Sequence, residues 1–184
     1  MRFTSLQILR LNFLDCNALT NNAAAALGSA LSSLTTLLSF SLTLNRIVLA
    51  DSVIGCIAAA LKSLHDLVSL KLEFATNMKS HPEQIQQLSE SLATLGHLQF
   101  LNISFNTQKS LSDDLLEKFG EGLKKLVLLK NLILDFTNAR VMTNKGVEAL
   151  TNAIQGLHNL SFLGLRLGDN AEKMRKLLKA SVQL

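Results

Sequence analysis

Four histidines come first among the residues that could do chemistry, because imidazole is a common metal ligand and a general base near neutral pH. They are His65, His81, His97 and His158. All but His81 fall where a predicted helix turns into the next predicted strand. No cysteine or acidic cluster accompanies them, as a metal site would require. We therefore predict hydrogen bonding at turns and helix ends, with no metal and no cofactor.

Nucleophilic chemistry has little support in the sequence. It contains no glycine-rich phosphate-binding loop, no H-E-x-x-H pair and no G-x-S-x-G elbow. Ser89 and Ser91 lie in a predicted helix with no base at a useful spacing. Nothing places Cys16 near Cys56, which favours a reduced chain inside the cell, cytoplasmic or organellar, over a disulfide scaffold. The sequence predicts no catalytic residue, and we expect a protein that is not an enzyme.

Composition limits the class of protein. The chain has 184 residues, of which 48% are hydrophobic and 17% charged, and this excludes intrinsic disorder. The length fits one domain over residues 1–184, and the net charge of +4 is only mildly basic. Residues 16–45 carry no charge, but Asn, Ser and Thr interrupt them too often for a bilayer helix. No membrane span is predicted.

The elements that would position a functional side chain follow from a repeat. Four apolar residues at spacings of 3, 2 and 2 recur in six frames, which start at residues 6, 37, 67, 98, 129 and 160. One frame consists of Leu98, Leu101, Ile103 and Phe105. Every frame after the first follows three apolar residues at spacings of 4 and 3, such as Leu88, Leu92 and Leu95. Every position of both sets is Leu, Ile or Phe.

The two spacings predict two kinds of element. Alternation with period 2 is typical of a strand with one buried face, and the 4-3 spacing lies on one face of a helix. Strands that recur every 30 or 31 residues with a helix between them must be parallel. The sequence therefore predicts an α/β solenoid of about six repeats. Its strands would line a concave face and its helices a convex face.

Polar residues mark the predicted helix starts. Ser112, followed by Asp113 and Asp114, is expected to cap the fourth helix and to place acid at its N-terminus. Pro82 fits the first turn of the third helix. The remaining candidates are Asn21 or Asn22, Asp51 or Ser52, and Thr143 or Asn144.

The pattern Leu-x-x-Leu-x-Leu-x-Phe with a following helix resembles the leucine-rich repeat. The period is similar to that of the ribonuclease-inhibitor-like type, with elongated repeats of 30–31 residues. The resemblance covers the chain from Phe3 into its last helix, and it implies a horseshoe-shaped solenoid. The Asn or Cys residues that follow the strands stand at variable offsets, so the loops are expected to differ between repeats.

The two predicted ends of the solenoid differ. No cap precedes the first strand, so an open N-terminal edge is expected at Leu6, Leu9, Leu11 and Phe13. A partner chain, a second copy, or residues outside this sequence would cover it. Residues 171–182 are predicted to form a C-terminal capping helix with the basic residues Lys173, Arg175, Lys176 and Lys179. These cations would be solvated, or would contact RNA or an acidic protein.

Residues between the buried strand positions must point to the opposite face of the sheet. Most are small or polar, but Phe100, Ile133 and Phe162 are large and apolar and stand on three neighbouring strands. Asp135 and Arg166 stand beside them. An apolar patch with a polar rim is typical of a contact site. The alternative is a local adjustment of packing.

These observations favour a protein–protein interaction scaffold or a structural subunit of a larger assembly. Its protein partners would bind the concave face and the N-terminal edge. One alternative is a regulator of an enzyme or GTPase, similar to the leucine-rich-repeat proteins that inhibit ribonucleases or assist the Ran GTPase. Another is a structural subunit that contacts RNA through the basic helix. The sequence leaves the partner, the organelle and the oligomeric state open.

Overall fold

The computed structural model describes residues 5–14, 19–45, 52–75, 82–105, 112–137, 143–167 and 176. Within them six strands alternate with five helices. The elements are β1 (Ile8–Leu14), α1 (Asn21–Ser32), β2 (Ser39–Asn45), α2 (Val53–Leu61), β3 (Ser69–Ala75), α3 (Pro82–Leu92), β4 (Phe100–Ser104), α4 (Asp113–Leu123), β5 (Asn131–Asp135), α5 (Asn144–Gln155) and β6 (Phe162–Arg166). The loops expected to vary after each strand lie largely outside the described residues.

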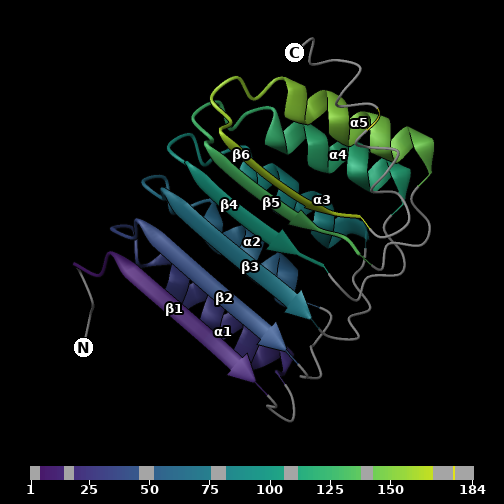
Figure 1. The fold of residues 1–184 in the computed structure, drawn as a ribbon. Helices are drawn as coiled ribbons and strands as arrows, with labels where there is room; N and C mark the ends of the chain where they lie inside the picture. The colour runs from purple at the N-terminus through teal and green to yellow at the C-terminus, as the bar shows by residue number, and fades with distance from the viewer. Residues whose placement is uncertain are drawn as a thin grey trace.

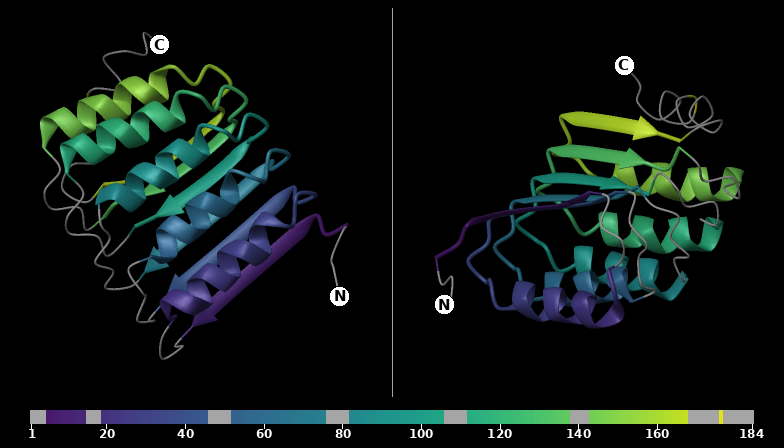
Figure 2. Two further views of the ribbon diagram at one scale, coloured as in Figure 1. Left: turned by 180° about the vertical axis from the view of Figure 1, so that it is seen from behind. Right: turned by 90° about the horizontal axis from the view of Figure 1, so that it is seen from below.

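The strands form one parallel sheet in chain order, β1 to β6. Each strand pairs with the next at an offset of 30 or 31 residues, as in the pairing of Leu101 with Leu132 and of Leu132 with Leu163. The five helices pack against one face of this sheet, and no described helix covers the other, which we call the open face (Figures 1 and 2). The predicted repeat of strand and helix is confirmed.

The core fills the space between the sheet and the helices. Inward strand residues such as Leu70, Leu101 and Leu132 are fully buried, as are the helix residues Leu92 and Leu123. At the ends of β3, β4 and β5 three phenylalanines stack along the solenoid axis. The ring centroids of Phe74 and Phe105 lie 5.3 Å apart, and those of Phe105 and Phe136 lie 6.0 Å apart. Each repeat thus buries its apolar residues against its neighbours.

Hydrogen bonds between successive helix starts add a second link between repeats. Asp113, the first residue of α4, accepts hydrogen bonds from the backbone N–H of Thr143 (2.8 Å) and of Gly146 (3.0 Å) and from the Thr143 hydroxyl (2.5 Å). Ser52, before α2, similarly donates its hydroxyl to Asn21 of α1 at 2.6 Å. The side chain at the start of one helix therefore binds the start of the next.

The predicted caps are right in part. Thr143 caps α5 and Pro82 begins α3, as expected, but Thr20 rather than Asn21 or Asn22 caps α1. Ser112 is the N-cap residue of α4 and Asp113 and Asp114 stand in its first turn, as predicted, although the Ser112 hydroxyl makes no capping hydrogen bond. The Asp113 carboxylate accepts hydrogen bonds from the start of the following helix, and the local spacing of residues does not predict this contact.

We expect Asp113→Asn to destabilise the protein near neutral pH and to lose this effect in acid. Burial opposes ionisation, but the hydrogen bonds from Thr143 and Gly146 and the charge of Lys145 outweigh it and hold the Asp113 pKa below its ordinary value. The stabilisation is present above the unfolded pKa of about 3.9 and is lost as the pH falls through the lower folded pKa. Thermal melts at pH 7 and pH 3 measure the difference.

Asp114→Asn is the matched control, since Asp114 is exposed and its described contact is an ion pair with Lys145 at 3.4 Å. It should change the melting temperature less than Asp113→Asn at pH 7. Equal shifts for the two variants would contradict the role of Asp113.

The end repeats are less enclosed than the middle ones. Leu6, Leu9, Leu11 and Phe13 at the N-terminal end are only partly buried, as expected for the predicted open edge. At the other end Leu160, Leu163 and Leu165 are also partly buried. The predicted C-terminal cap, residues 171–182, lies outside the described residues apart from Lys176, which is helical and exposed.

Candidate functional site

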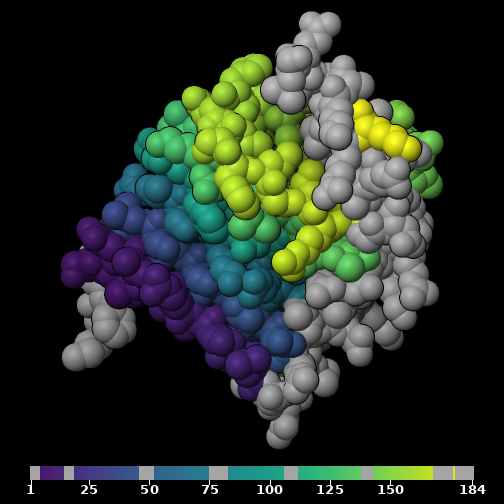
Figure 3. All heavy atoms as spheres, in the orientation of Figure 1, coloured from purple at the N-terminus to yellow at the C-terminus, as the bar shows by residue number. Residues whose placement is uncertain are grey.

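The open face carries the candidate site, and its side chains form three rows across the strands. One row runs Ile8, Ser39, Ser69, Phe100, Asn131 and Phe162; the next runs Arg10, Ser41, Lys71, Asn102, Ile133 and Gly164; the third runs Asn12, Thr43, Glu73, Ser104, Asp135 and Arg166. Figure 3 views the molecule from this face. The register agrees with the outward positions predicted from the sequence.

The predicted apolar patch lies on β4, β5 and β6. Phe162 is 52% exposed, whereas Phe100 and Ile133 are half-buried. Phe100 and Phe162 share a row with Asn131 between them, which places their strands about 10 Å apart. The three side chains form one surface, which we call the β4–β6 patch.

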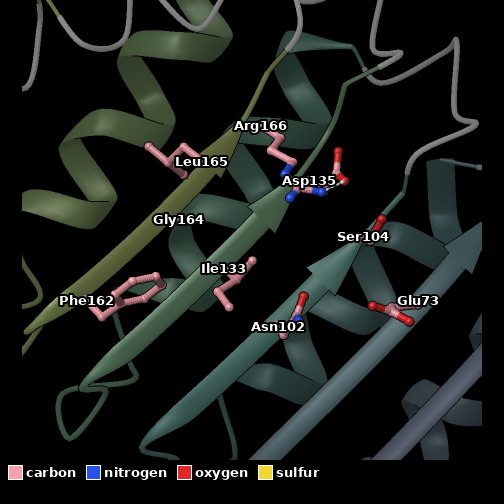
Figure 4. A pocket seen from close by; sticks show the side chains of 9 residues that line it. All are labelled: Glu73, Asn102, Ser104, Ile133, Asp135, Phe162, Gly164, Leu165 and Arg166. Atoms are coloured by element: carbon pink, nitrogen blue, oxygen red, sulfur yellow. Dashed lines mark ion pairs between the residues drawn. The ribbon is translucent and has the colours of Figure 1, made fainter.

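A hollow of about 430 Å³ opens beside this patch (Figure 4). Its lining includes Ile133 and Phe162 on the apolar side and Asn102 and Ser104 on the polar side. Gly164 lies between the apolar pair: a Cβ placed on it would stand 3.4 Å from both Ile133 Cγ1 and Phe162 Cε1. Because Gly164 has no side chain, the floor of the hollow stays open. Phe100 does not line it.

Asp135 and Arg166 stand at the far end of the hollow, at the ends of β5 and β6. Asp135 is only 8% exposed, and its Oδ1 accepts hydrogen bonds from the Thr137 backbone N–H and hydroxyl. Its Oδ2 lies 3.7 Å from Nη1 of Arg166, whose side chain is 78% exposed. Asp135 thus stands beside the patch in the predicted outward row and lines the hollow, but its contact with Thr137 leaves its carboxylate largely buried. Arg166 remains available at the surface.

Glu73 closes the side of the hollow nearest β3. Its carboxylate accepts a hydrogen bond from the Thr43 hydroxyl (3.1 Å) and pairs with Lys71 Nζ (3.0 Å). Most charged groups of the hollow thus have partners within the sheet, and a ligand there would meet amide, hydroxyl and apolar groups beside the Arg166 guanidinium.

Sequence reasoning missed Asn102, Ser104, Glu73 and Gly164 as parts of the site. All four belong to the predicted outward rows, but small or polar residues are expected on any solvent-exposed face of a sheet. The absence of a side chain at Gly164, between two large apolar neighbours, was the available signal.

The other chemical candidates stay apart. His65, His97 and His158 are exposed, and His97 Nδ1 lies 3.8 Å from Asp66 Oδ1, while His81 lies outside the described residues. The Ser89 hydroxyl donates to the carbonyl of Lys118, and that of Ser91 to the carbonyl of Gln87. Both serines have structural partners.

The described residues contain no group of three or more His, Cys, Asp or Glu side chains able to hold a metal ion. None of the helices there is long and apolar enough to cross a bilayer. Cys56 is a free thiol in α2, and Cys16 is not among the described residues.

No protein-family model matches the sequence, and no curated protein is significantly similar to it.

Proposed function

We propose that this chain is a non-enzymatic scaffold or assembly subunit that binds a protein partner on its open face, through the β4–β6 patch. The observation that carries the proposal is the exposed ring of Phe162 beside Ile133 and the hollow over Gly164. Aromatic side chains next to a pocket are common anchors in protein interfaces. The exposed guanidinium of Arg166 would orient the partner at the margin.

We also propose that the repeats are leucine-rich repeats of the ribonuclease-inhibitor-like type, and that the sheet lines the concave side of a horseshoe. The support is the fixed 30–31-residue register and the buried Leu, Ile or Phe residues at equivalent places in β2 to β5. A crystal structure whose sheet does not curve around the open face would contradict this assignment.

The experiment compares two double variants in quantitative co-purification from the native source, followed by affinity measurement with the purified partner. Phe100→Ser with Phe162→Ser removes the two rings of the patch. Each anchor contributes about 2 kcal/mol, roughly a thirty-fold change in affinity, so binding should be lost. The melting temperature should change little, since neither ring is fully buried.

Val127→Ser with Leu128→Ser is the matched control, because both are exposed hydrophobic residues in the turn before β5. This control should bind like the wild type. A third variant, Gly164→Leu, keeps both rings but fills the hollow, and it should also weaken binding. Retained binding by the phenylalanine variant would exclude the patch, and a collapse of its stability would show that the rings belong to the core.

A further inference from the structure

The outer edge of β1 has a defined set of backbone groups. In the described part of the chain, β1 has a neighbouring strand only on the side of β2. Gln7 points its carbonyl to β2, where it accepts the N–H of Ser39 at 2.9 Å. Backbone groups alternate in direction along a strand, so Leu9, Leu11 and Phe13 also face β2. The N–H and C=O groups of Ile8, Arg10, Asn12 and Leu14 therefore point to the outer edge.

The side chains beside this edge are apolar and almost free of charge. Leu9, Leu11 and Phe13 are half-buried on the core side, and Leu27 and Leu34 of the same end of the molecule are also partly buried. On the open face, Ile8 is 55% and Leu14 53% exposed. Arg10 is the single charged residue among described residues 5–14 and 19–45. This edge lies at the N-terminal end of the sheet, which is purple in Figure 3. Because it carries almost no charged residues, its composition is similar to that of the centre of a protein interface.

We propose that this edge pairs with β1 of a second copy of the chain. The two strands run antiparallel, with Leu11 opposite Leu11 on a two-fold axis. This register overlaps all seven residues of β1. It sets Ile8 against Leu14, Leu9 against Phe13, and Arg10 against Asn12. The β1 edge lies at the opposite end of the sheet from the β4–β6 patch, so this proposal does not depend on the proposed function.

The backbone fits this register. Ile8 with Leu14 and Arg10 with Asn12 are pairs of residues whose N–H and C=O groups all point outward. An antiparallel ladder needs two hydrogen bonds in each such pair, and each pair occurs twice about the axis. If the register shifted by one residue, the outward N–H and C=O groups of one copy would lie opposite residues of the other copy whose backbone groups already bond to β2. No proline interrupts the strand.

The side chains favour a second copy over an unrelated strand, because the order of types in β1 is symmetric about Leu11. Apolar residues meet apolar residues at every pair except Arg10 with Asn12, where a cation meets a polar amide rather than another cation. A two-fold axis perpendicular to the sheet keeps both helix layers on one side. The half-buried leucines of both copies would then form one continuous core, as in other isologous dimers.

Cysteine cross-linking tests the register, in a background with Cys16→Ser and Cys56→Ser. Leu11→Cys places two thiols in a pair whose Cα atoms are about 4.5 Å apart, within disulfide range. Leu9→Cys is the matched control on the same face, but its two copies would lie about 14 Å apart along the strands. With oxidised glutathione, we expect a covalent dimer for Leu11→Cys and none for Leu9→Cys. Equal cross-linking of the two variants would overturn the proposal.

Sedimentation of the full chain tests the pairing without cysteines. Asn12→Pro removes an outward N–H and leaves the bonds to β2 intact, a place where edge strands tolerate proline. It should raise the dimer dissociation constant about tenfold or more, whereas Asn12→Ala should leave it nearly unchanged. A wild-type chain that stays monomeric at high concentration would overturn the proposal. So would a dimer in which the Arg10 and Asn12 amides exchange hydrogen as fast as exposed ones.

Discussion

Replacing Phe105 by Ala should lower the free energy of unfolding by about 3–5 kcal/mol. Phe105 is fully buried and is the middle ring of the stack that joins β3, β4 and β5. Its removal leaves a cavity bordered by Phe74 and Phe136, which the parallel backbones on either side prevent from closing. Equilibrium denaturation in urea measures the loss.

Phe162→Ala serves as the control for that experiment. This ring belongs to the last described strand and is half exposed, so its removal should lower the free energy of unfolding by less than about 1 kcal/mol. Comparable losses for the two variants would mean that Phe162 is a core residue, which would also remove the basis of the proposed binding patch.

A single methyl group at Gly122 should destabilise the protein by about 1–3 kcal/mol. Gly122 lies in α4 against α3, and a Cβ there would stand 2.5 Å from both the carbonyl oxygen and the hydroxyl of Ser89. The carbonyl belongs to helix backbone and cannot move alone, so Gly122→Ala must push the two helices apart. Thermal and urea melts of the variant report the cost.

Gly156→Ala is the corresponding control at the end of α5. The atom nearest to a Cβ added at Gly156 is the Ala153 carbonyl oxygen, and the distance of 3.5 Å is an ordinary contact. Alanine there should be neutral or slightly stabilising, because it restricts the unfolded chain. Destabilisation by Gly156→Ala equal to that of Gly122→Ala would contradict the explanation by close helix contact.

The sheet, its register and the open-face rows could be predicted because they depend on a pattern repeated six times. A single Leu at position 101 says little, but Leu at the same place in neighbouring frames fixes which side chains point inward. Helix caps were less predictable. Asp113 stands next to Ser112 in the chain, yet its partners Thr143 and Gly146 are 30 or more residues away and depend on how neighbouring helices align.

The candidate site was predictable in its apolar part and at Arg166. Phe100, Ile133 and Phe162 are conspicuous because large apolar residues are unusual in the outward rows. Asp135 looked like a surface residue by the same alternation, but its carboxylate turns toward Thr137 at the end of β5. The hollow over Gly164 exists because this residue has no side chain to fill the space between Ile133 and Phe162. That space can be recognised only when the strands are aligned with one another.

Each element of the structure packs mainly against the equivalent element of the preceding and following repeats. Such a chain can change in length by whole modules. Loss of residues 67–97 would bring Leu98 to the place of Leu67, and every new neighbour in the buried strand and helix columns would again be Leu, Ile or Phe. A duplicated module would widen the sheet by about 4.8 Å. Gene duplication could thus adjust the span of the open face to the size of a bound protein while leaving the internal contacts of the other modules unchanged.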